Sequence, residues 1–137
     1  HIYHQRMLEV RSLDTAQQIE KYINDNIAWD LSIEHLCAHF SISRAELYQL
    51  FHTNFNASVA DYIRSKRIAM AEQLIRTTSM QISEIAANVG FFDYNYFSKV
   101  FHRKFGVSPR EYRKRLEDNG TGQEKTAEQG QSNTKKA

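Results

Sequence analysis

One part of this chain is repeated roughly fifty residues further on, and this duplication restricts the possible folds more than any other feature. Apolar residues of the first copy recur in the second, as in the pairs Ile33 with Ile82 and Tyr62 with Tyr112. The other matched positions of the first copy are Leu36, Ala38, Phe40, Leu47, Leu50, Phe51, Phe55 and Ser58. Two copies do not make a solenoid, because about three repeats are needed to bury the repeat faces.

Each copy has the pattern of a short helix, a tight turn and a longer helix, which is the helix-turn-helix arrangement. We expect one such unit at residues 32–55, a second at 82–105, and a long linker helix at 58–77 between them. A final helix is expected at 108–117, where a serine, a proline and a glutamate form a helix-start signal. No strand-like alternation is present, so the sequence predicts an all-α fold with two helix-turn-helix subdomains.

The two ends of the chain differ from this body. Asp14 has the chemistry of an N-cap for a first helix that runs to about Asn26. We therefore interpret residues 1–13 as a linker or a remnant of one, and residues 14–117 as the folded domain. Residues 118–137 contain no large apolar side chain, and this composition predicts a disordered tail.

The net charge of +2 hides an uneven distribution of charge. Residues 94–115 contain seven basic residues and one acidic residue, whereas residues 1–35 contain six acidic and three basic residues. A basic end favours a polyanionic partner such as nucleic acid. The alternative is a helical protein-interaction module whose basic end docks on an acidic protein. No apolar run approaches the roughly 20 residues that span a bilayer, so no membrane partner is expected.

Helical periodicity predicts which side of the longer helix in each unit is buried. In the second unit the buried side contains Phe97, Val100, Phe101 and Phe105, and in the first unit Leu47, Leu50, Phe51 and Phe55. The outward side of the second helix contains Asn95, Lys99 and His102, with Tyr96, Ser98 and Arg103 on the flanks. The outward side of the first contains Ala45, Gln49 and His52, with Glu46 and Tyr48 on the flanks. The rings expected to meet solvent or DNA are Tyr48, Tyr94 and Tyr96.

These outward residues suit the major groove of double-stranded DNA. Gln49 and Asn95 carry amides that can bond adenine at two atoms, Lys99 can donate to guanine, and Ala45 can contact a thymine methyl group. Helix starts such as those at Ser32 and Ser43 can donate hydrogen bonds to phosphates. We expect contacts to the DNA backbone from Ser32, Ser43, His52, Arg64, His102, Arg103 and Lys104.

Other kinds of site have little support in the sequence. His35 and His39 are spaced as zinc ligands can be, but a third ligand and a catalytic glutamate are missing, so no metal is expected. The single cysteine, Cys37, excludes an intramolecular disulfide. No nucleophile motif or phosphate-binding glycine loop is present, so the sequence predicts neither an enzyme nor a cofactor. Arg67 falls in the apolar stripe of the linker helix, where we expect it to be partly buried and bonded to a carboxylate or a helix C-terminus.

The segments "IAANVGFFDYNYFSKVFHRKFGVSPREYR" (85–113) and "LCAHFSISRAELYQLFHTNF" (36–55) resemble the DNA-binding domain of the AraC/XylS family of bacterial transcription regulators. The resemblance covers residues 14–116. It implies seven helices, and recognition helices that enter successive major-groove segments about 34 Å apart. By position, the base-reading residues of the family fall on Ala45, Tyr48, Gln49, Tyr94, Asn95, Ser98 and Lys99.

The resemblance also implies a biological setting. The protein would act in the bacterial cytoplasm as a transcription activator that contacts RNA polymerase. Most members of the family carry a separate sensor domain ahead of the DNA-binding part, and none is recognisable in this sequence.

Overall fold

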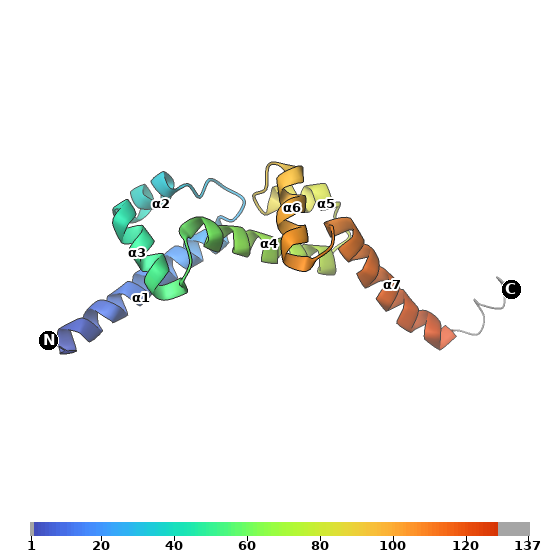
Figure 1. The fold of residues 1–137 in the computed structure, drawn as a ribbon, viewed down its shortest axis with the longest axis horizontal. Helices are drawn as coiled ribbons and strands as arrows, with labels where there is room; N and C mark the ends of the chain where they lie inside the picture. Colours follow the sequence, from blue (N-terminus) through green and yellow to red (C-terminus); the bar gives the residue numbers. More distant parts are fainter. Residues whose placement is uncertain (1, 129–137) are drawn as a thin grey trace.

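The computed structural model describes residues 2–128, and in that range the chain forms seven α-helices and no strand (Figure 1). The helices are α1 (Ile2–Asp25), α2 (Ile33–Phe40), α3 (Arg44–Phe55), α4 (Val59–Thr77), α5 (Ile82–Asn88), α6 (Tyr94–Phe105) and α7 (Pro109–Glu128). The all-α class predicted from the sequence is confirmed, with α2–α3 and α5–α6 as the two helix-turn-helix pairs.

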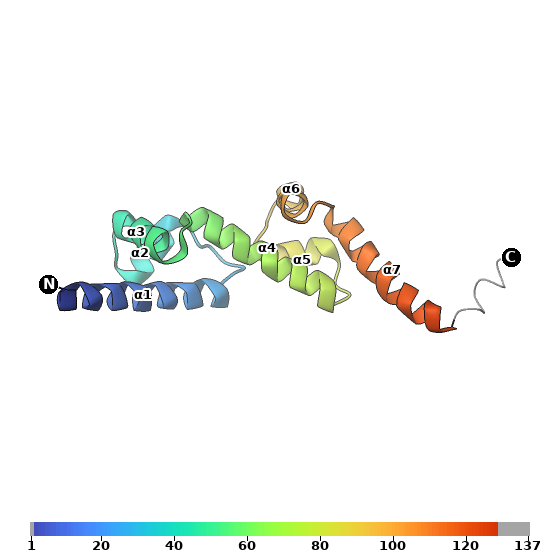
Figure 2. The ribbon, with the colours of Figure 1, turned by 60° about the horizontal axis from the view of Figure 1, so that its bottom comes forward.

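Two separate hydrophobic cores hold these helices, and α4 contributes to both. The first core lies among α1, α2, α3 and the start of α4, which supplies Val59 and Ile63. The second lies among the rest of α4, α5 and α6, with Tyr112 of α7 packed against it; here α4 supplies Ile68, Ala71 and Ile75. Because one continuous helix enters both cores, the two units are placed at its two ends (Figures 1 and 2).

Hydrogen bonds at the helix starts explain why each recognition helix begins where it does. The Ser43 hydroxyl accepts the backbone N–H of Glu46 at 3.1 Å, and the Glu46 carboxylate accepts the N–H of Ser43 at 3.2 Å, which forms a capping box. In the second unit Asp93 takes this role: its carboxylate accepts the N–H groups of Asn95 and Tyr96. Both caps satisfy backbone donors that the first turn leaves free.

The turn of the second unit depends on Gly90, whose φ of +98° is one that side chains with a Cβ rarely adopt. A Cβ at this position would also lie 2.6 Å from Nε of Arg67 and from the carbonyl oxygen of Ile27. Arg67 itself donates from Nε to the Ile27 carbonyl and from Nη2 to the Trp29 carbonyl, each at 3.0 Å. The expected partly buried arginine is confirmed, and its acceptors are carbonyls in the segment after α1.

The duplication extends further than the sequence comparison indicated. The Tyr62 hydroxyl donates to the carboxylate of Glu20 on α1, and the Tyr112 hydroxyl donates to the carboxylate of Glu72 on α4 at 2.6 Å. Each tyrosine ring also packs edge-on against a buried phenylalanine of its unit, Phe51 or Phe101. The repeated structure is therefore three helices, α1–α3 and α4–α6, each closed by a tyrosine from the next helix.

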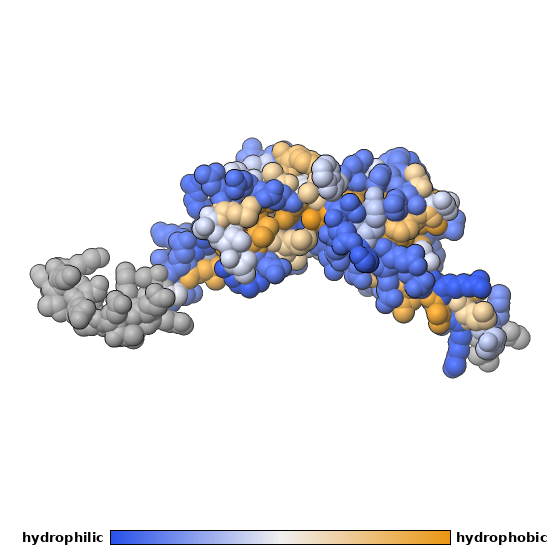
Figure 3. All heavy atoms as spheres, turned by 180° about the vertical axis from the view of Figure 1, so that it is seen from behind, coloured by the Kyte–Doolittle hydropathy of each residue, from blue (hydrophilic) through white to orange (hydrophobic). Residues whose placement is uncertain are grey.

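Helix ends account for most differences from the sequence predictions. The first helix begins at Ile2 rather than at Asp14, whose carboxylate accepts a hydrogen bond from the side chain of Gln18 and caps nothing. Residues 2–13 contain neither glycine nor proline and are rich in good helix formers, so the helix continues through them. Apolar side chains along this part of α1 are exposed and visible from behind (Figure 3).

At the other end, α7 continues past the expected limit of 117 to Glu128, because no proline or left-handed residue ends it there. Disorder was predicted from residue 118, so residues 118–128 correct that prediction, and residues 129–137 lie outside the described range. Within α4, Met70 is 36% exposed, whereas Ile68 is buried. None of the helices within 2–128 has the length and apolar character needed to cross a bilayer.

Candidate nucleic-acid interface

The exposed side of α6 gathers most of the residues predicted for the second unit. Phe97, Val100 and Phe101 are buried, as the periodicity predicted, and this leaves the opposite side of the helix in solvent. A shallow hollow of about 740 Å³ runs along that side and into the start of α7. It is lined by Asn95, Ser98, Lys99, His102, Arg103 and Ser108. Five predicted contact residues of this unit therefore lie together on one surface.

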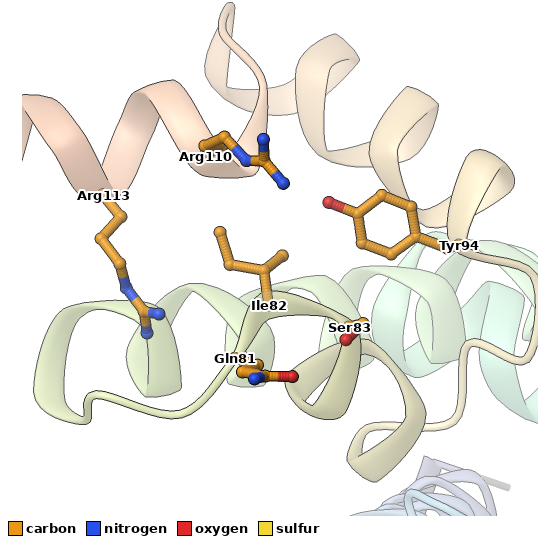
Figure 4. A pocket seen from close by; sticks show the side chains of 6 residues that line it. All are labelled: Gln81, Ile82, Ser83, Tyr94, Arg110 and Arg113. Atoms are coloured by element: carbon orange, nitrogen blue, oxygen red, sulfur yellow. The ribbon is translucent and has the colours of Figure 1, made fainter.

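Tyr94 lies apart from this hollow, at the rim of the second unit. Its ring is 39% exposed and its centroid lies 6.0 Å from that of Phe97, so the ring partly covers the core. Figure 4 shows its hydroxyl turned toward α7 and the guanidinium of Arg110. Tyr94 was expected to meet solvent or DNA, and the family resemblance placed it among the base-reading residues; the structure shows a ring that is partly exposed and partly packed on the core.

In the first unit the buried residues Leu47 and Phe51 fix the rotation of α3. All the predicted outward residues of this helix are exposed: Ala45, Tyr48, Gln49 and His52. Glu46, the acidic neighbour of this surface, is turned back to the start of its own helix by the capping box. The Gln49 amide nitrogen donates one N–H to the hydroxyl of Thr53 at 3.0 Å, which leaves its second N–H and its carbonyl oxygen to bond a base.

The two recognition helices lie on the same side of the molecule. In Figure 2, α2 and α3 lie above α1, and α6 lies above α4 and α5. Helix α4 holds the two units in this arrangement, because its side chains pack into both cores. A single rod-shaped partner that lies along α4 can therefore contact both recognition helices at once.

The predicted backbone-contact residues have different surroundings. Ser32 is half-buried, and its hydroxyl oxygen accepts the backbone N–H of His35 at 3.1 Å, so the hydroxyl proton is left to donate. His52, His102, Arg103 and Lys104 are exposed. Arg64 is already paired with Asp61, and it donates from Nη1 to the Tyr96 hydroxyl at 3.3 Å. It therefore lies in the groove between the two units, away from the outward side of α6.

Several exposed residues near this surface were missed by the sequence analysis. Trp29 and Phe92 are 70% and 82% exposed and line the groove between the units, although only Tyr48, Tyr94 and Tyr96 were expected to have rings in solvent or on DNA. Arg110 is exposed beside Tyr94. Phe92 lies in a turn and Arg110 at a helix start, where the helical wheel of α6 carries no information.

The two histidines with metal-like spacing have other partners. His35 Nε2 lies 2.6 Å from the Tyr22 hydroxyl, and the His39 ring stacks on the Tyr22 ring with centroids 4.0 Å apart. Across the described range, no group of three or more His, Cys, Asp or Glu side chains is placed to hold a metal ion.

Comparison with known proteins gives consistent matches. A family of helix-turn-helix domains matches residues 36–115. The transcriptional activator RhaR of Cronobacter sakazakii is 38% identical over 100 residues, which are 73% of this chain and 35% of that protein. The chain thus spans about a third of the length of the curated relatives it matches.

Two solved structures extend the comparison. The C-terminal domain of the two-component response regulator YesN from Fusobacterium nucleatum superposes with a TM-score of 0.68 at 30% identity, over 73% of this chain and 98% of that one. A transcriptional regulator with an AraC-type DNA-binding domain from Chromobacterium violaceum superposes with a TM-score of 0.67 at 27% identity. That match covers 79% of this chain and 94% of the other.

Proposed function

The chain belongs to the AraC/XylS family of bacterial transcription regulators, and on that basis we propose that it is a DNA-binding output domain that recognises a specific duplex sequence. The observation that carries this proposal is the position of both recognition helices on one side of α4. Two helices held in this way match two major-groove segments that face the same side of B-DNA, one helical turn or about 34 Å apart.

The side chains on these helices support a division of labour. Asn95 and Lys99 in the second unit, and Gln49 in the first, carry the groups that discriminate bases in the major groove. Tyr48, Ala45 and Ser98 add contacts at the edges of this reading surface. A further set of residues positions the protein on the duplex by contacts to phosphates. We assign these contacts to Ser32, Ser43, His52, Arg64, His102, Arg103 and Lys104.

Three further parts of the proposal concern the intact protein. The relatives named above are regulators, and one is an activator, so we propose that activation through RNA polymerase is the output. Because the chain matches about a third of such proteins, a sensor domain in the remaining part fits the same function. The setting of this function is the bacterial cytoplasm, and no enzymatic step or cofactor is part of it.

Selection of bound duplexes from a random DNA pool, followed by a salt titration on the selected sequence, tests the proposal. We expect two short motifs about ten base pairs apart and a steep fall of affinity with salt, since each phosphate contact releases about one counterion. A single enriched motif would mean that one unit alone reads sequence. No enrichment with a flat salt dependence would favour the alternative, a module that docks its basic end on an acidic protein.

A further inference from the structure

A second cleft, of about 480 Å³, opens between the starts of α5, α6 and α7 (Figure 4). Its lining residues are Gln81, Ile82, Ser83, Tyr94, Arg110 and Arg113. The Arg110 guanidinium and the Tyr94 hydroxyl point toward one another across this cleft, and Ile82 lies between them at its floor. Two hydrogen-bond donors thus converge over an apolar floor.

The two arginines of the cleft differ in what they already bind. Arg113 donates to the carbonyl oxygens of Ile75 at 3.2 Å and Thr78 at 3.1 Å, at the end of α4, and these bonds occupy its guanidinium. Arg110 is exposed and forms no ion pair or hydrogen bond with any other described side chain. Its guanidinium is therefore a charged, two-pronged donor that no described side chain occupies, and phosphate is a group that this geometry fits.

The cleft adjoins the reading surface of the second unit. Tyr94 and Ser98 are four residues apart on α6, so they lie one above the other on the same side of the helix. Ser98 and the start of α7 also line the hollow that contains Asn95 and Lys99. A ligand bound at Arg110 therefore lies directly beside a duplex that occupies that hollow.

The duplication supplies an internal comparison. The first-unit positions equivalent to Ser83, Tyr94 and Arg110 are Glu34, Arg44 and Ala60. There the Arg44 guanidinium is paired with the Glu34 carboxylate at 2.6 Å, and Ala60 offers no charge. Arg44 of the first unit is therefore paired with an anion, whereas Arg110 of the second unit has no anionic partner among the described side chains.

We propose that Arg110 and the Tyr94 hydroxyl bind one backbone phosphate of duplex DNA next to the second half-site, and that the first unit has no equivalent phosphate site. This inference rests on the proposed function. It assigns Tyr94 to the backbone instead of a base, and it adds Arg110, which the sequence analysis did not select.

The experiment compares Arg110→Ala with Arg115→Ala, a matched control on the same helix whose guanidinium is paired with Glu111 at 3.2 Å. Affinities are measured against salt on the selected duplex and on a scrambled duplex. We expect Arg110→Ala to weaken both complexes roughly five- to tenfold and to reduce the slope of log affinity against log salt by about one. Arg115→Ala should keep the parent slope. Thermal melting of both variants checks that the fold is intact.

A second arm locates the phosphate. Single methylphosphonate substitutions, which remove one backbone charge, are placed along the flank of the second half-site. At one position the methylphosphonate should lower the affinity of the parent protein and leave the affinity of Arg110→Ala unchanged. The phosphate site would be overturned if the selected duplex still bound but the salt slope of Arg110→Ala equalled that of the parent. It would also be overturned if Arg115→Ala reduced the slope as much as Arg110→Ala. If the parent protein bound no duplex at all, the proposed function itself would fail.

Discussion

Lys99 and Arg103 lie one turn apart on the exposed side of α6, yet we expect different consequences when each is truncated. Lys99 projects from the pole opposite the buried Phe97, where a base edge would lie. Lys99→Ala should weaken binding and relax the preference at one base position by about 1–3 kcal/mol. Arg103→Ala should weaken all sequences alike. Affinities for single-base variants of the selected duplex distinguish the two, and an equal loss on every variant would remove Lys99 from the base-reading set.

The carboxylate of Glu72 makes the stability of the fold depend on pH. Burial alone would raise the pKa of Glu72, but hydrogen bonds from Arg76 and Tyr112 outweigh it and lower that pKa below its ordinary value of 4.5. The carboxylate gains these donors only on folding, so the stabilisation is fully present above pH 4.5 and is lost as the pH falls through the lowered value.

Glu72→Gln should therefore melt at a lower temperature than the parent near neutral pH. The melting temperatures of the two proteins should converge as the pH falls below 4.5, because the parent then loses the contribution that the variant lacks. Glu84→Gln, at an exposed position on α5, serves as the control and should follow the parent at every pH. A constant difference between Glu72→Gln and the parent across the whole range would contradict the assignment.

At the scale of the helices, one arginine joins the start of α7 to the end of α4. The Arg113 guanidinium donates to the carbonyl oxygens of Ile75, Thr78 and Met80, which follow or close the last turn of α4. Arg113→Ala would leave these half-buried acceptors without their charged donor, so the free energy of unfolding should fall by about 2–3 kcal/mol. Arg113→Lys should recover little of it, because an ammonium cannot reach three carbonyls in a planar fork. Urea denaturation measures the free energy of unfolding of both variants. Arg110→Ala serves as the control and should have the free energy of unfolding of the parent.

Helix rotation could be predicted from the sequence, and contacts between helices could not. The buried and exposed sides of α6 follow from the spacing of Phe97 and Phe101, because a 3.6-residue period needs no knowledge of other elements. The start of α1 did not follow, because Asp14 has cap chemistry but its carboxylate bonds Gln18. The cleft at Arg110 could not be predicted, since three separate segments form it.

At the scale of the whole molecule, the relative orientation of the two units determines which DNA they can bind together. Helix α4 joins them, and Arg67 lies at the junction, bonded to two carbonyls of the first unit and in contact with Gly90 of the second. Burial lowers the pKa of Arg67, and the Asp30 carboxylate opposes that change. We expect this contact to fix the angle between the two recognition helices.

Arg67→Ala should therefore change the spacing preference as well as the stability. Each base pair added or removed between the half-sites rotates one of them by about 35° around the duplex, so the parent should lose affinity steeply for such duplexes. The variant, with a looser junction, should bind the selected duplex more weakly but lose less affinity when one base pair is inserted or deleted.

Gln73→Ala, at an exposed position of the same helix, is the control and should keep the spacing preference of the parent. Affinity for a duplex with a single half-site is measured as well, because a loss of folded structure in Arg67→Ala would lower that affinity too. If Arg67→Ala lost the same factor on every spacing and on the single half-site, Arg67 would support the fold without setting the distance between the two reading surfaces.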